Sequence, residues 1–320
     1  MTLRTPLTER LAIQHPVLLA PMDLVSDALL TAAVSAAGGL GLLGGGYGDE
    51  DWLRRELDAL AAAKARFGVG FITWSLARQD RLLDLTLERK PALVMLSFGD
   101  VRELLPRIQR AGVPVLCQVQ TLAMALEAVA AGAGMLVAQG GEAGGHGVGR
   151  GLMALLPEIV DAVGGRVPVV AAGGIADGRG LAAALMLGAA GVLVGTRFYA
   201  SDEAAGAPAA KQRIVAATGD ASVRSIVFDI SRRNVWPAPF NGRCLRNAHT
   251  ERWLGRELEL MQNVEAESAR YLAARQAQDF DIAAVIAGEA AGLIRDVQPA
   301  ARIVAGMVEQ AEGLLTRRGA

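Results

Sequence analysis

Cysteine and histidine are scarce in this sequence of 320 residues. The two cysteines, Cys117 and Cys244, cannot build a disulfide framework, and neither belongs to a Cys-x-x-Cys motif. We therefore expect a reducing, cytoplasmic environment. The three histidines, His15, His146 and His249, are dispersed and form no His-x-His or His-Glu-x-x-His pattern. That dispersion argues against a metal site.

The sequence also has no excess of positive or negative charge, and it has few aromatic side chains. The formal net charge is −1, so nothing favours nucleic acid or an anionic membrane as a partner. Aromatic residues make up 4%, too few to predict stacking platforms for single strands. Residues 1–16 carry dispersed charges and no apolar signal-peptide core. The uncharged stretch 28–48 has the length of a membrane span but is broken by glycines, and we interpret it as a helix followed by a buried strand.

Short apolar segments recur along the first 200 residues, each ending in glycine, proline or a small polar residue. Each has strand length and is apolar on both faces, which is typical of a buried parallel strand. Helical patterns separate them, for instance "DEDWLRRELDALAAAKA" with acidic residues in its first turn. The predicted strands lie within residues 16–22, 39–46, 67–73, 92–99, 113–119, 134–141, 167–174 and 191–198.

Eight strands alternating with helices predict a (βα)8 TIM barrel, and a doubly wound sheet is the alternative. After residue 205 the chain becomes richer in charge and reads as helical. We therefore predict a helical subdomain over residues 206–290, inserted near the C-terminus as a lid on the barrel mouth. The barrel itself would comprise residues 1–205 and 291–320, with a last helix over about 300–315.

Glycines cluster where the predicted strands end, which in such a barrel is the face that carries the active site. The segments after the seventh and eighth strands, "AGGIADG" (172–178) and "GTRF" (195–198), are the usual phosphate-binding pair. Backbone N–H groups of Gly173, Gly174 and Gly195 and the hydroxyl of Thr196 suit an anion. Asp177 is predicted to cap a helix. Because no GxxxxGK[ST] or Rossmann GxGxxG motif is present, the pattern favours a mononucleotide or a sugar phosphate.

The loop after the sixth strand, "QGGEAGGHGVGRG" (139–151), places His146 among seven glycines. Glycine is favoured where something must approach the backbone closely. Histidine titrates near neutral pH, so His146 is the candidate acid–base group, the alternative being a local structural hydrogen bond. Glu142, the nearest carboxylate, either orients the ring or simply packs. His249 is expected at the surface or in the lid.

These residues together resemble the nitronate monooxygenase family, formerly called 2-nitropropane dioxygenases. The motifs that carry the resemblance occur in the family's order, from "LLAPM" and "QGGEAGGHGVG" to "AAGGIADGRG", "GTRF" and "AGEAAGLI". The resemblance implies a TIM barrel that binds FMN non-covalently under a helical second domain. It implies His146 as the catalytic residue. The cofactor-binding residues that it implies are Pro21, Met22, Gly70, Gln118, Gln139, Gly144, Gly145, Ala172, Gly173, Gly174, Gly195 and Thr196.

Two departures from the family pattern bear on the substrate. Gly70 stands where relatives often have the Asn of "GVN", and Gln118 replaces a Lys seen in some members. The resemblance implies oxidation of alkyl nitronates, such as propionate 3-nitronate, by O₂ to a carbonyl compound and nitrite. An FMN-dependent NAD(P)H reductase of the quinone or enoyl-acyl-carrier-protein type is the alternative, and a flavin-binding protein without turnover is a third. The oligomeric state stays open, with a homodimer among the options.

Overall fold

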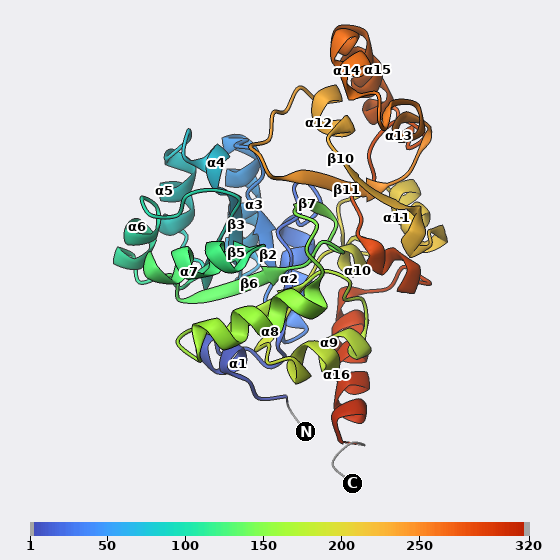
Figure 1. The fold of residues 1–320 in the computed structure, drawn as a ribbon. Helices are drawn as coiled ribbons and strands as arrows, with labels where there is room; N and C mark the ends of the chain where they lie inside the picture. The colour runs from blue at the N-terminus through green and yellow to red at the C-terminus, as the bar shows by residue number, and fades with distance from the viewer. Residues whose placement is uncertain (1–2, 317–320) are drawn as a thin grey trace.

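The computed structural model describes residues 3–316 and contains an eight-stranded parallel barrel wrapped in helices (Figure 1). The strand order is β1-β9-β8-β6-β5-β4-β3-β2, and a bridge between Leu18 and Leu40 joins the two end strands. This closure confirms the predicted barrel and excludes the doubly wound sheet. The strands are β1 (Val17–Leu19), β2 (Leu42–Gly44), β3 (Gly68–Ile72), β4 (Leu93–Ser97), β5 (Val115–Val119), β6 (Met135–Gln139), β8 (Val169–Ala172) and β9 (Gly191–Val194).

Helices follow the strands as the sequence pattern predicts. Several begin at a capping side chain, among them Asp27, Asp49 and Thr121, which accept backbone N–H groups of the first turn. Asp177 is confirmed as a cap, because it accepts the N–H of Arg179. The helices around the barrel are α2 (Ala28–Ala36), α3 (Glu50–Ala62), α4 (Thr73–Leu76), α5 (Arg81–Glu88), α6 (Leu105–Arg110), α7 (Leu122–Ala130), α8 (Leu152–Val163), α9 (Gly178–Met186), α10 (Thr196–Tyr199) and α16 (Ala300–Thr316).

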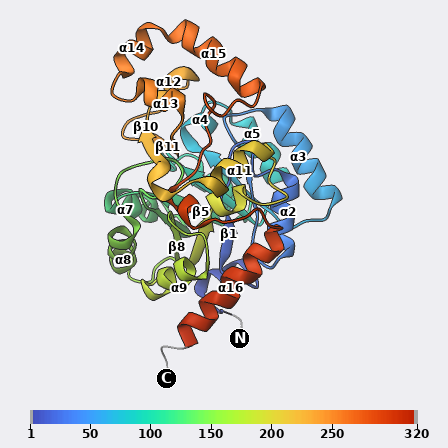
Figure 2. The ribbon, with the colours of Figure 1, turned by 90° about the vertical axis from the view of Figure 1, so that its right-hand side faces the viewer.

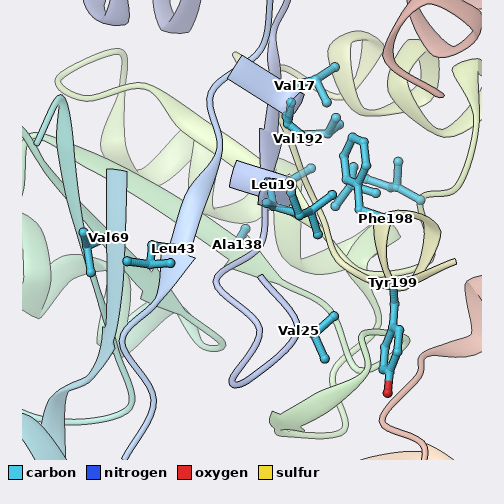
Figure 3. Packing of buried hydrophobic residues seen from close by; sticks show 14 of the residues in the cluster. Val17, Leu19, Val25, Leu43, Val69, Ala138, Val192, Phe198 and Tyr199 are labelled. Atoms are coloured by element: carbon cyan, nitrogen blue, oxygen red, sulfur yellow. The ribbon is translucent and has the colours of Figure 1, made fainter. Parts of the chain in front are cut away.

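Alternation of side chains along each strand divides the apolar core into two layers. One layer fills the barrel interior, and α1 (Pro6–Leu11) closes its amino-terminal end with Leu7 and Leu11. The other layer lies between the strands and the surrounding helices and includes Val17, Leu19 and Phe198 (Figure 3). Apolar side chains therefore fill the barrel from its amino-terminal end, which leaves the carboxyl-terminal end as the place for a site within the barrel.

The last helix returns to the barrel after the insertion. α16 packs against α9 and α2, which confirms the predicted closing helix over about 300–315. Figures 1 and 2 show α16 running down to the end of the molecule where both termini lie, opposite α14 and α15.

The segment between α10 and α16 contains strands as well as helices. Only helices were predicted there, but β10 (Ser222–Ser225) and β11 (Asn241–Leu245) form an antiparallel sheet with β7 (Gly145–Gly147), a strand within the loop after β6. This sheet lies above the barrel in Figure 1. The other elements are α11 (Pro208–Ala216), η1 (Gly219–Ala221), α12 (Val227–Ser231), α13 (Ala248–Trp253), α14 (Glu257–Gln262), α15 (Val264–Gln276) and η2 (Glu289–Leu293).

The division into a barrel of residues 1–205 and 291–320 and a lid of residues 206–290 stays a prediction. Residues 1–2 and 317–320 of those ranges lie outside the described residues. Within residues 3–316, no helix has the length and apolar character needed to cross a membrane.

Candidate active site

The uppermost inward-facing positions of the barrel strands are occupied by small or polar residues. All but Gly70 lie two residues beyond an apolar side chain of the barrel interior, as Gln118 lies beyond Leu116 and Ala172 beyond Val170. Glycine, alanine or serine at all but the two glutamine positions leaves room above the apolar interior, so the layer can act as the floor of a site. Its members are Ala20, Gly44, Gly70, Ser97, Gln118, Gln139, Ala172 and Gly195.

The loop after β1 lies over part of this floor. A Cβ on Gly70 would lie 2.2 Å from the ring of Pro21, so a larger residue at position 70 would displace the proline. A Cβ on Gly195 would lie 3.6 Å from the sulfur of Met22. The structure thus brings Pro21 together with Gly70 and Met22 together with Gly195, and the two members of each pair are far apart in the sequence.

A network of amides connects the floor to the histidine loop. The Gln139 side-chain oxygen accepts hydrogen bonds from Gln118 at 3.0 Å and Gln120 at 2.8 Å, and its amide nitrogen donates to the carbonyl of His146 at 3.0 Å. Gln139 and Gln120 are almost completely buried. Because buried amides are costly when unpaired, this network holds the backbone at His146 in one place.

The turn after β8 has the backbone that the glycines there predict. Gly173 and Gly174 have φ of 109° and 71°, a conformation that glycine adopts without strain. At Gly174 the nearest neighbours of a Cβ would be the Cβ and Cγ of Glu142, at 3.5 and 3.8 Å. Beside this turn, the hydroxyl of Thr196 accepts the N–H of Gly288 at 3.0 Å and keeps its own proton to donate.

The close approach expected at Gly144 is made by the chain itself. A Cβ on Gly144 would lie 2.7 Å from backbone atoms of Ala287 and Gly288. The packing of the chain itself therefore requires glycine at position 144, and a contact between this residue and a cofactor stays a prediction. At Gly145, by contrast, φ is 75° and the nearest atom to a Cβ would be 3.7 Å away, in Ile286.

Two arginines of the β10–β11 hairpin hold the glycine loop. Arg224 donates to the carbonyls of Gly141 at 3.0 Å and Ala143 at 3.2 Å, and Arg243 donates to Gly141 at 2.9 Å. Burial, with help from the charge of Arg243, lowers the pKa of Arg224 to about 10. Glu142 neither orients His146 nor merely packs, because its carboxylate accepts the N–H of Leu152 and so caps α8.

His146 lies on β7, directly opposite Gly242 of β11. Its Nε2 is 3.0 Å and 3.1 Å from the two carboxylate oxygens of Asp229, which belongs to α12. Burial lowers the pKa of His146, although the carboxylate of Asp229 acts in the opposite direction. The imidazole is therefore predominantly neutral at neutral pH, which suits a group that has to accept a proton.

Aromatic side chains gather around His146 although the sequence has few of them. Trp236 stacks on the imidazole, with ring centroids 3.5 Å apart, and its indole N–H donates to the Tyr47 hydroxyl at 3.1 Å. Trp74 and Phe98 contact Trp236 edge to face, and Phe240 contacts Phe98. The side of the site next to His146 is therefore aromatic and largely apolar.

A cavity of about 780 Å³ lies beside the turn formed by Gly173 and Gly174. It runs between α8 and α9 and is lined by Leu152, Ile175 and Arg243 as well as Gly173 and Gly174. Neither His146 nor Gln118 lines it. This cavity therefore lies next to the predicted phosphate turn and apart from the acid–base group.

His249 lies in the inserted segment, but it is buried there rather than at the surface. Its side chain is fully covered, with Nε2 2.8 Å from the hydroxyl of Ser231 and Phe228 stacked on the ring. The expected surface position was wrong because α13 turns this residue into a small core with Tyr271.

Sequence reasoning missed Asp229, Trp236, Gln120 and Arg224. Asp229 and Trp236 lie in "VFDISRRNVWPAPF", which carries no spacing typical of an acid–base site. Only the pairing of β11 with β7 brings that segment to His146. Gln120 had a weak signal, since it follows the polar Gln118 by two residues at the end of the same strand.

A closed (βα)8 barrel with a candidate acid–base residue, small floor residues and a glycine turn at its carboxyl-terminal end is typical of a barrel enzyme. The nitronate monooxygenase family model matches residues 4–73 and 71–310. The chain belongs to the nitronate monooxygenase family. The family and the relatives that it matches make it an oxidoreductase.

Similar proteins cover nearly the whole chain. A nitronate monooxygenase from Metarhizium robertsii is 37% identical over 94% of this chain and 92% of that protein, and one from Neurospora crassa is 32% identical over 93% and 90%. Among solved structures, FabK from Thermotoga maritima is similar with a TM-score of 0.86 at 31% identity over 99% of each chain. A nitroalkane oxidase from Streptomyces ansochromogenes has a TM-score of 0.83 at 28% identity, covering 98% of this chain and 99% of that one.

Proposed function

We propose that this protein is an FMN-dependent nitronate monooxygenase that uses O₂ to convert alkyl nitronates, such as propionate 3-nitronate, into a carbonyl compound and nitrite. The observation that carries the proposal is the position of His146, held beside the barrel mouth in a chain of this family. A neutral imidazole next to an apolar aromatic wall suits a small nitroalkane or its nitronate.

The residues present fit a flavin mononucleotide. The floor of small and amide side chains gives a flat group space above the barrel interior, and Gln118 and Gln139 offer polar atoms to its edge. The turn at Gly173 and Gly174, with Gly195 and Thr196 on the next strand, suits the phosphate, since both glycines have positive φ. Pro21, Met22, Gly70, Ala172, Gly144 and Gly145 complete the set that we assign to the cofactor.

FMN would supply the redox chemistry, and the chain's own residues position the substrate and move its proton. His146 would take the proton from the carbon next to the nitro group of a neutral nitroalkane. Toward a preformed nitronate, a protonated His146 would pair with the anion. The stacked Trp236 and the neighbouring Phe98 would exclude water from this face of the ring.

One purified sample tests this proposal. We expect a yellow protein whose cofactor, released by heat and identified by chromatography, is FMN. Addition of propionate 3-nitronate should cause oxygen uptake and nitrite formation. Stoichiometric FAD, or no flavin binding on reconstitution, would contradict FMN as the cofactor. A flavin-loaded protein that consumes no oxygen with any nitronate would contradict the proposed oxidation of nitronates.

An FMN-dependent NAD(P)H reductase is the second candidate. It is supported by the similarity to FabK and by a Mycobacterium tuberculosis carboxyl-CoA dehydrogenase that is 38% identical over 70% of this chain and 63% of that protein. Rapid mixing with NADH or NADPH separates the candidates. Fast bleaching of the flavin favours the reductase, and slow bleaching with rapid nitronate turnover favours the oxidase.

A further inference from the structure

Asp229 comes from the inserted segment, 83 residues beyond His146 in the sequence, yet both of its carboxylate oxygens lie within 3.1 Å of Nε2. The two side chains are 8% and 7% exposed, so water competes little for this interaction. A buried carboxylate that faces one nitrogen of a candidate base is a specific arrangement, since burying a charge is costly unless it is paired.

The helix that carries Asp229, α12, is held in place by contacts with His249. Ser231, two residues further along α12, donates its hydroxyl to the carbonyl of Val227 and lies 2.8 Å from Nε2 of His249. Phe228 of the same helix stacks on His249. Since β11 fixes His146 and this buried cluster fixes α12, neither partner of the pair can move away easily.

The orientation of the His146 ring is also determined. Trp236 lies parallel to it, with an interplanar angle of 8°, and Phe98 contacts it edge to face. An ionised carboxylate only accepts hydrogen bonds, so Nε2 must carry the proton of the neutral ring. Nδ1 then keeps its lone pair, and within residues 3–316 it makes no hydrogen bond.

We propose that Asp229 is a positioning residue that holds His146 as the Nε2–H tautomer, leaving Nδ1 as the atom that accepts the substrate's proton. The part about the substrate's proton rests on the proposed function, whereas the tautomer does not. The active site would then be incomplete without α12, and the inserted segment would contribute to the chemistry as well as to coverage of the barrel.

Some charges around His146 raise its pKa and others lower it. Asp229 of α12 favours the imidazolium, while Arg232, one residue beyond α12, and Arg224 of β10 disfavour it. Burial disfavours it most, so the pKa of His146 is below its usual value. Removing the negative charge of Asp229 should therefore lower the pKa of His146 further.

The three histidines make the tautomer directly measurable. Protein labelled with ¹⁵N-histidine and carrying its bound cofactor should give three sets of imidazole signals, which His15→Gln and His249→Gln variants assign. We expect the His146 set to show protonated Nε2 and unprotonated Nδ1. Protonated Nδ1 in the neutral wild-type ring would overturn the proposal, and this measurement needs no Asp229 variant to fold.

Asp229→Asn supplies the second test, with Glu265→Gln as the matched control in the same segment, since Glu265 is 86% exposed. In Asp229→Asn we expect loss of the Nε2–H preference and a lower titration midpoint for His146. Activity with a neutral nitroalkane should fall by about 10²- to 10⁴-fold, as when the aspartate that orients a catalytic histidine is removed. Turnover of a preformed nitronate should fall much less.

An unchanged tautomer and midpoint in folded Asp229→Asn would overturn the positioning role. Equal losses on the neutral and the anionic substrate would overturn Nδ1 as the proton acceptor. Absence of nitrite formation by the wild type would count against the proposed function alone, because the histidine signals report on the tautomer whatever the reaction is.

Discussion

Trp236 lies face to face with His146, their ring centroids 3.5 Å apart and their planes 8° from parallel. The indole reaches this position from the segment between α12 and β11, and its N–H is bonded to Tyr47 beyond β2. One aromatic residue thus connects the barrel mouth, the inserted segment and the acid–base group. Its neighbours Trp74 and Phe98 follow β3 and β4, so four other parts of the chain meet at the Trp236 ring.

Replacement of Trp236 by alanine should remove one of the contacts that orient the His146 ring. Aromatic pairs contribute about 0.5–1.5 kcal/mol beyond the area they bury, so we expect kcat/KM with nitronate to fall by about 2- to 10-fold. Steady-state oxygen uptake measures this change. Val235→Ala is the matched control, because Val235 is 88% exposed and should change nothing. Equal kinetics for Trp236→Ala and wild type would show that the stack has no role in turnover.

His146→Asn keeps a hydrogen-bonding group of similar size but removes a group that titrates near neutral pH. Loss of a general base costs about 10²- to 10⁴-fold, and we expect that loss with a neutral nitroalkane. A preformed nitronate needs no base, so its kcat should fall much less, with KM rising if the imidazolium binds the anion. Flavin content should be nearly unchanged. Full activity of the variant on both substrate forms would make His146 a packing residue.

Gly174→Val should weaken flavin binding while the barrel stays folded. At φ 71° a branched side chain is strained, and it would fill space beside the backbone that we assign to the phosphate. We expect at least a roughly tenfold higher Kd for FMN, measured by fluorescence titration. Gly149→Val is the control, because no atom lies within 4 Å of a Cβ there and no positive φ is required. Equal affinities in the two variants would place the phosphate elsewhere.

His249 predicts how stability depends on pH. Burial lowers its pKa to about 4, whereas an unfolded chain has a value near 6.5. Between these values the unfolded state binds more protons, so acidification from about pH 6.5 to 4 should destabilise the fold by up to about 1.4 kcal/mol per pH unit. Thermal unfolding at several pH values measures this dependence. His249→Gln should have a smaller difference in Tm between pH 7 and pH 5. An unchanged difference would show that His249 does not cause the pH dependence.

Much of the barrel follows from local sequence. Residues 16–22, 113–119 and the other apolar segments each contain a barrel strand, because a strand buried on both faces needs a continuous apolar run. The cap at Asp177 and the closing helix α16 were likewise predictable, since both depend on residues near one another in the chain. Strand ends and glycine clusters together also indicated which face of the barrel carries the site.

The residues that surround His146 were decided by the tertiary structure. His146 stood out by itself as a lone histidine in a glycine loop, but its partner Asp229 lies in a segment without a recognisable spacing. The two meet because β7 pairs with β11, and an antiparallel pairing over nearly a hundred residues is set by packing and loop closure rather than by local preference. The sequence by itself therefore determined the barrel, its glycine turn and the candidate base, whereas the tertiary structure decided what orients that base.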